Sequence, residues 1–167
     1  MNKYTAAVIQ YDSSNNKSDN LKEFSSLIDT AAGKGAKLVA MSEYFNLIGD
    51  NTGDGGAEEK IPGYTIDIIR KKAIEHNIWI QCGSIAEENP GGKPFNTAVL
   101  INGSGEIVCK YSKLHMFDVE LSNGISAKES DTKQAGSKIV TADTEIGHFG
   151  FSICYDMRFP ELYRIMT

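Results

Sequence analysis

The order in which apolar patterns follow one another at the start of the chain most constrains the fold. Residues 4–11 (YTAAVIQY) form a short apolar run of the kind expected for a buried strand. A helical repeat follows, carried by Leu21, Phe24, Leu27, Ile28 and Ala31. Residues 36–41 (AKLVAM) then form a second short apolar run. A strand, a helix and a strand in that order predict a layered α/β fold.

Local signals mark both ends of this first helix. Ser18 can cap its N-terminus, and Asp19 places a negative charge in its first turn. Gly33 and Gly35 supply the flexible backbone at which helices commonly end. We therefore expect a helix that is capped by Ser18 and ended by these two glycines.

The middle of the chain continues the α/β pattern. Thr65 can cap a helix that runs to about His76, and residues 78–84 (IWIQCGS) indicate a strand. Two apolar runs flank the sequence NGSG at 102–105, which is a strong signal for a β-hairpin. Residues 114–138 predict a loop-rich region.

The last part of the chain is predicted to hold two strands and the start of a helix. The strands fall within residues 139–154, and Pro160 suits the first position of a helix, where its missing N–H is not needed. No glycine or proline ends this helix before Thr167. An open α/β sheet would normally continue from such a point, so we expect this chain to be the first portion of a longer domain.

Charge and cysteine content narrow the range of partners. The net charge is −5, from 17 basic and 22 acidic residues, and no basic cluster stands out. We therefore expect neither a nucleic-acid partner nor a membrane partner. The three cysteines have no framework spacing, which favours a reduced, cytoplasmic setting. The three histidines are scattered, so no metal site is predicted.

Cys154 is the most informative single residue, within GFSICYDMRFPEL (150–162). A lone cysteine after an apolar run is usually a small buried hydrophobic residue. A strand-to-helix turn would instead expose the thiol, and the helix N-terminus would lower its pKa and make it a nucleophile. Ser152 offers a competing nucleophile in the pattern G-x-S-x-C, which lacks the final glycine of the serine-hydrolase elbow.

Two acidic residues and one glycine-rich loop are further candidates. Glu43 follows the predicted strand at 36–41, where α/β sheets place catalytic groups, although it could equally cap a helix or face solvent. Glu129 lies in a predicted loop and, considered alone, is an ordinary surface charge. Residues 51–64 could cradle a phosphate, but they match neither the P-loop nor the dinucleotide fingerprint.

Lys113 lies at the end of a predicted strand. Its position puts it on the face shared by Ile107, Cys109 and Tyr111. A lysine on an inward face is uncommon, because burial of an ammonium group is costly without a partner. The alternative is a lysine at the sheet edge whose stem is buried and whose charge reaches solvent.

Taken together, three blocks of sequence resemble the signature blocks of the nitrilase superfamily of carbon–nitrogen hydrolases. They are MSEYF (41–45), KYSKLHMFDVE (110–120) and FSICYDMRFPEL (151–162), in the family's order and with suitable gaps. The resemblance extends from the first strand to Thr167. One departure is Ser42, where many members of the family have proline, and it should alter loop stiffness more than chemistry.

The resemblance implies a role for each candidate residue. It makes Glu43 the general base, Lys113 the oxyanion stabiliser and Cys154 the nucleophile. Glu129 matches the family's second glutamate, which positions the substrate and the lysine. The resemblance implies neither a metal nor a cofactor.

Two residues of the third block are expected to contribute to substrate binding. We expect the backbone N–H of Tyr155 to hold the oxyanion together with Lys113. Arg158 is a candidate partner for a substrate carboxylate, and a structural ion pair is an equally good explanation of it.

The resemblance also implies a fold and a domain. It implies a four-layer αββα sandwich of the nitrilase type, of which residues 1–167 are the N-terminal portion. These residues would form a single carbon–nitrogen hydrolase domain with its C-terminal part missing. Because apolar surface would then be uncovered, we expect self-association into a homo-oligomer.

The function implied is hydrolysis of non-peptide carbon–nitrogen bonds. HMFDVE and CYDMRFPEL resemble the omega-amidases and the amidases of deaminated glutathione, which makes small amides of dicarboxylic acids the expected substrates. The alternatives are an inactive truncated fragment, a non-catalytic binding module, and a thiol redox sensor that uses Cys154.

Overall fold

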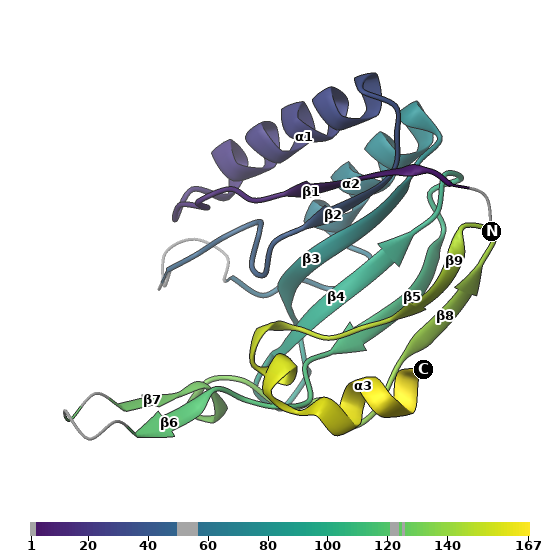
Figure 1. Cartoon of the computed structure of the whole chain (residues 1–167). Helices are drawn as coiled ribbons and strands as arrows, with labels where there is room; N and C mark the ends of the chain where they lie inside the picture. Colours follow the sequence, from purple (N-terminus) through teal and green to yellow (C-terminus); the bar gives the residue numbers. More distant parts are fainter. Residues whose placement is uncertain (1–2, 50–56, 121–123, 125) are drawn as a thin grey trace.

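The computed structural model describes residues 3–49, 57–120, 124 and 126–167. In it, β1 to β5 form one sheet in the spatial order β1-β2-β3-β4-β5, shown in Figure 1. Two smaller pairs, β6-β7 and β8-β9, complete the strands of the described residues. None of the described helices combines the length and the apolar character needed to cross a bilayer.

The elements follow the chain in the order expected for a layered α/β fold. Their bounds are β1 (Thr5–Ile9), α1 (Lys17–Gly33), β2 (Ala36–Met41), α2 (Tyr64–His76), β3 (Trp79–Glu87), β4 (Phe95–Ile101), β5 (Ile107–Ser112), β6 (Asp118–Glu120), β7 (Ser126–Lys128), the 3₁₀ turn η1 (Glu129–Asp131), β8 (Thr141–Thr144), β9 (Gly147–Gly150), the 3₁₀ turn η2 (Cys154–Arg158) and α3 (Pro160–Met166).

The sheet is mixed, and its connections explain why. The strands β1, β2 and β3 are parallel, because α1 and α2 connect them. Short turns connect β3 to β4 and β4 to β5, so those two pairs are antiparallel. The predicted strand–helix–strand start and the predicted hairpin around 102–105 are both confirmed.

Each face of the sheet has its own apolar core. Helices α1 and α2 cover one face, where Phe24 and Ile69 pack against strand residues such as Ile80. In Figure 1 the β8-β9 pair and the segment after it cover part of the other face. Phe151 and Tyr111 belong to the buried cluster there. The described chain is therefore a helical layer, a mixed sheet and a second, two-stranded β layer.

The helix starts differ from those predicted. The side chain of Asn16, not Ser18, caps α1 by accepting a hydrogen bond of 3.1 Å from the backbone N–H of Asp19. Gly63 occupies the cap position of α2, and Thr65 lies inside the first turn, where it is buried. The predicted caps Ser18 and Thr65 are therefore wrong, because each helix begins earlier in the chain than these residues require.

Two details of the strands also differ from prediction. A register shift in the β4-β5 pair places Ile107 with the helix-side core, whereas Cys109 packs with the opposite core. The predicted common face of these two residues is therefore wrong, because a bulge exchanges the faces of a strand. The predicted loop 114–138 contains the β6-β7 hairpin, which projects from one end of the sheet in Figure 1.

Candidate active site

One pocket gathers the four residues to which the family resemblance gives catalytic roles. Its volume is about 490 Å³, and Glu43, Lys113, Glu129 and Cys154 line it. Glu43 follows β2, Lys113 follows β5, Glu129 begins η1, and Cys154 begins η2. The residues come from four separate segments, so only the folded sheet brings them together.

Lys113 is the electrostatic centre of this pocket. Its side chain is only 2% exposed, and its Nζ donates to Glu129 Oε2 at 2.8 Å and to Glu43 Oε1 at 3.2 Å. Burial disfavours its charged form, but the hydrogen bond to Glu129 and the charges of both carboxylates outweigh burial and raise the pKa of Lys113. Lys113 is thus a buried cation, not the sheet-edge lysine of the alternative interpretation.

Glu129 is not a free surface charge. Besides the Lys113 ammonium, its Oε2 accepts a hydrogen bond of 2.7 Å from the backbone N–H of Phe117. That contact connects η1 to the segment that precedes β6. Glu129 therefore holds the β6-β7 hairpin to the pocket and supplies the second carboxylate beside Lys113.

Cys154 occupies a strained position at the edge of the pocket. Its φ angle of 48° lies in the left-handed region, which non-glycine residues adopt at an energetic cost. It is exposed, whereas Cys82 is buried and Cys109 is half-buried, and all three cysteines are free. The turn thus presents the thiol to the pocket, as the nucleophile interpretation requires.

The predicted low pKa of this thiol is wrong. Desolvation is the largest influence, and the Glu43 charge and hydrogen bond add to it, so the pKa of Cys154 is raised although Lys113 opposes the shift. The expected helix N-terminus is only the short 3₁₀ turn η2, which has little dipole to offer. Cys154 is therefore a protonated thiol at rest, beside a carboxylate that can accept its proton.

A close backbone approach fixes the segment that carries Glu43. A Cβ atom on Gly83 would lie 1.7 Å from the carbonyl oxygen of Ser42, so only glycine allows β3 to pass there. The next residue, Ser84, accepts a 3.1 Å hydrogen bond from the backbone N–H of Tyr44. Because Tyr44 has a φ angle of 50°, these contacts hold a strained turn directly after the glutamate.

A buried carboxylate fixes the turn that carries Cys154. Asp156 is fully buried, and its Oδ2 accepts from the Tyr111 hydroxyl at 2.6 Å and from the Ile153 backbone N–H at 2.9 Å. Its Oδ1 accepts from the backbone N–H of His115 at 3.0 Å. Asp156 thus connects the nucleophile turn to the segment on either side of Lys113.

The other residues considered from the sequence lie outside this lining. Tyr155 stacks edge-on against Phe117, and Arg158 is exposed; neither is among the described residues that line the pocket. Ser152 accepts a 2.9 Å hydrogen bond from the Tyr163 hydroxyl and borders a neighbouring groove that Glu43 and Cys154 also line. Residues 51–56 of the loop considered as a phosphate cradle (51–64) lie outside the described residues.

Sequence reasoning missed three residues that support the site: Gly83, Asn96 and Asp156. Asn96 is fully buried on β4, and its Nδ2 donates to Glu43 Oε1 at 2.7 Å. The sequence carried a partial signal for Gly83 and Asp156. A glycine inside a predicted strand often marks a close backbone approach, and Asp156 follows the candidate nucleophile by two positions. The sequence carried no local signal for Asn96.

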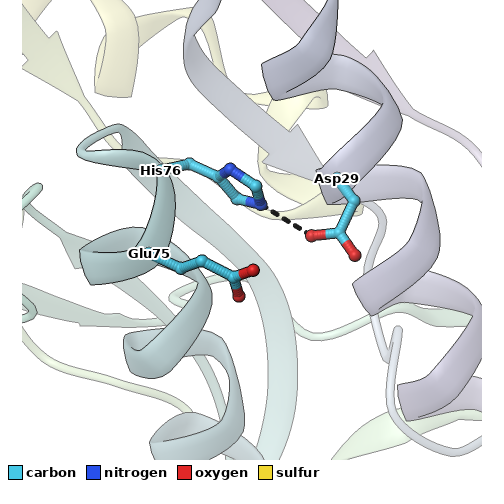
Figure 2. Close-up of side chains that lie close together, drawn as sticks. All are labelled: Asp29, Glu75 and His76. Atoms are coloured by element: carbon cyan, nitrogen blue, oxygen red, sulfur yellow. Dashed lines mark hydrogen bonds and ion pairs between the residues drawn. The ribbon is translucent and has the colours of Figure 1, made fainter.

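One cluster away from the pocket has metal-ligand chemistry. The carboxylates of Asp29 and Glu75 and the ring of His76 converge between α1 and α2, as Figure 2 shows. The Lys72 ammonium lies 2.8 Å from Asp29 Oδ1 and 2.9 Å from Glu75 Oε2. Since a cation already bridges these carboxylates, we interpret the cluster as an ion-pair network that joins the two helices.

The chemistry available in the pocket is that of a nucleophile with a base and a fixed cation. A thiol, an adjacent carboxylate and a buried ammonium group can together open a carbonyl, hold the oxyanion and move a proton. The fold and the site therefore define a class: an α/β protein with a thiol, two carboxylates and a buried ammonium group in one pocket.

Comparisons with known proteins identify the family. The profile of the family described as carbon-nitrogen hydrolase matches residues 5–167, so the chain belongs to the carbon–nitrogen hydrolases of the nitrilase superfamily. It is 38% identical over 165 residues to the Omega-amidase NIT2 of Mus musculus, a match that covers 99% of this chain and 59% of the relative. It is 37% identical over 171 residues to the Deaminated glutathione amidase of Synechocystis sp. (strain PCC 6803 / GT-S), covering 100% of this chain and 63% of the relative.

A solved structure supports the fold. The NitFhit protein of C. elegans superposes with a TM-score of 0.82 at 32% identity, over 95% of this chain and 40% of that protein. Of the two curated relatives named above, the chain spans about three fifths of the length. The α/β part of the predicted fold is confirmed, with a mixed five-stranded sheet and its helices. The four-layer sandwich stays a prediction.

Proposed function

We propose that this protein hydrolyses the carbon–nitrogen bond of small amides through a thioester on Cys154. The observation that carries the proposal is the shared pocket in which the buried Lys113 ammonium bridges Glu43 and Glu129, beside the exposed Cys154. Family membership and two curated relatives named as amidases support the same conclusion.

The first half-reaction forms the thioester. Cys154 is protonated at rest, so Glu43 takes the thiol proton as sulfur attacks the amide carbon. The Lys113 ammonium and the backbone N–H of Tyr155 hold the oxygen that becomes negative in the tetrahedral intermediate. Glu43 then gives the proton to the departing nitrogen, ammonia leaves, and the acyl group stays on sulfur.

The second half-reaction restores the enzyme. Glu43 takes a proton from a water molecule that attacks the thioester carbon, and the same oxyanion donors hold the second intermediate. The carbon–sulfur bond breaks, the proton returns to sulfur, and the carboxylic acid leaves. Glu129 keeps the Lys113 ammonium in place through both halves by its 2.8 Å hydrogen bond.

The proposed substrates are monoamides of short dicarboxylic acids. Omega-amidase is the printed name of one relative, and the pocket has an apolar wall that includes Leu47 and Phe117. Lys128 and Lys133 line the same pocket and can attract a distal carboxylate. Arg158 was the sequence candidate for that contact, and the pocket lining favours Lys133.

The test is ammonia release by the full natural chain from a short dicarboxylic monoamide and from a neutral amide of equal length. We expect Cys154→Ala to abolish release from both. We expect Lys133→Gln to raise KM for the monoamide about tenfold, with no change for the neutral amide. Turnover that persists in Cys154→Ala would refute the mechanism, and a KM effect in Arg158→Gln alone would return the carboxylate contact to Arg158.

A further inference from the structure

Asn96 connects the two halves of the candidate active site. It is fully buried on β4, and its side-chain Nδ2 donates to Glu43 Oε1 at 2.7 Å across a sequence separation of 53 residues. Its backbone carbonyl accepts a 2.9 Å hydrogen bond from the N–H of Lys113. One residue thus touches the predicted base and the backbone of the predicted oxyanion cation.

The hydrogen bond also selects which oxygen of Glu43 is free. Asn96 Nδ2 and Lys113 Nζ both donate to Oε1, at 2.7 and 3.2 Å. Oε2 is therefore the oxygen available to the Cys154 thiol, whose contact with Glu43 contributes to its raised pKa. With two donors on one oxygen, the carboxylate cannot rotate without losing a charge-assisted hydrogen bond.

The other end of the Asn96 amide has no hydrogen-bond partner within the part of the chain that the structure describes. Its Oδ1 is buried and accepts no hydrogen bond from the described residues. A buried acceptor without a donor destabilises a fold, and an apolar residue of the same shape would avoid that cost. A purely structural role would therefore favour leucine at this position, whereas a need to donate to Glu43 requires the amide.

From these contacts we propose that Asn96 is a positioning residue that holds Glu43 in the orientation needed to accept the Cys154 proton. The inference rests on the proposed function, because it assigns Asn96 to the thiol-activation step. It acts only through Glu43. The other titratable groups that interact with this part of the site are the neighbouring Tyr44, Lys113 from the end of β5, Glu129 from η1 and Cys154 from η2. A substitution at Asn96 changes none of these side chains.

The experiment separates stability from activation in the full natural chain. In Asn96→Leu we expect single-turnover acylation of Cys154 by p-nitrophenyl acetate to slow at least tenfold, since a misplaced base loses most of its advantage. The urea midpoint should change little or fall, because Glu43 loses a charge-assisted hydrogen bond while the unpaired acceptor is removed. Thr97→Val is the matched control on the same strand: Thr97 is buried and hydrogen-bonded to Glu87, so its loss should lower the midpoint and leave acylation unchanged.

A pH profile gives a readout that a structural role would not move. A hydrogen bond to a carboxylate favours its charged form, so loss of the Asn96 donor should displace the acid limb of the acylation profile to higher pH in Asn96→Leu. Unchanged acylation and an unchanged profile, with or without a lower midpoint, would overturn the role of Asn96. Acylation of the wild type without amide turnover would refute the proposed hydrolysis and leave the comparison between variants valid.

Discussion

Replacement of Lys113 by methionine tests the electrostatic core of the site. The substitution keeps the length of the side chain and removes its charge, so Glu43 and Glu129 face each other without the cation that bridges them. Removal of one partner from a buried ion pair lowers the free energy of unfolding by about 3–5 kcal/mol. We expect the lower value, about 3 kcal/mol, because 28% of the Glu43 side chain is exposed to solvent.

The pH dependence of this loss has a defined sign. The pKa of Lys113 is raised in the folded protein, so its contribution is complete below the unfolded value of about 10.4 and is lost only as pH rises through the raised value. Between pH 5 and pH 8 the wild type keeps that contribution. Protonation removes the charge of an uncompensated carboxylate, so the deficit of Lys113→Met should shrink as pH falls towards 5.

The measurement is urea unfolding of the wild type and the variant at pH 5 and pH 7.5. Lys110→Met is the control, since Lys110 lies on β5, the strand that Lys113 follows, and pairs with Glu87, with 41% of the Lys110 side chain exposed. Loss of the Lys110–Glu87 ion pair should lower the free energy of unfolding by less than about 1 kcal/mol. Equal losses in the two variants, or a Lys113→Met deficit that does not change with pH, would refute the claim that Lys113 is a buried bridging cation.

Two further substitutions test how the site is held. Gly83→Ala should lower the free energy of unfolding in urea by about 1–3 kcal/mol, because the added Cβ would lie 1.7 Å from the Ser42 carbonyl oxygen. Gly33→Ala is the control and should be neutral or stabilising, because no atom lies within 4 Å of a Cβ at that position. Similar effects at both positions would contradict the close-approach argument. Asp156→Asn should lower the free energy of unfolding by about 2–3 kcal/mol, because the amide NH₂ group would face hydrogen-bond donors such as the Tyr111 hydroxyl. A melting temperature equal to that of the wild type would contradict this prediction.

The sequence predicted the order and kind of the main elements because their patterns are local. Strand β2 has the bounds expected from its apolar run, and α3 starts at Pro160 because proline suits the first position of a helix. The hairpin around NGSG followed from turn chemistry alone. Predictions failed where a neighbouring segment decided the outcome, as at the caps of α1 and α2 and at the bulge that moved Ile107.

The candidate site divides in the same way. Glu43, Lys113 and Cys154 could be named from the sequence because each follows an apolar run in a block typical of the family. The sequence could not give the direction of the pKa shift of Cys154, because desolvation and the charges of Glu43, Lys113 and Glu129 exist only in the folded state.

The supporting residues were decided by tertiary structure alone. Gly83 matters because another backbone passes close to it, and Asp156 matters because two segments donate to one buried carboxylate. Asn96 lies 53 residues from Glu43, and the pairing of β3 with both β2 and β4 brings them together. Local patterns determine which elements form, whereas the donors, charges and close approaches that surround a reactive group depend on which strands become neighbours.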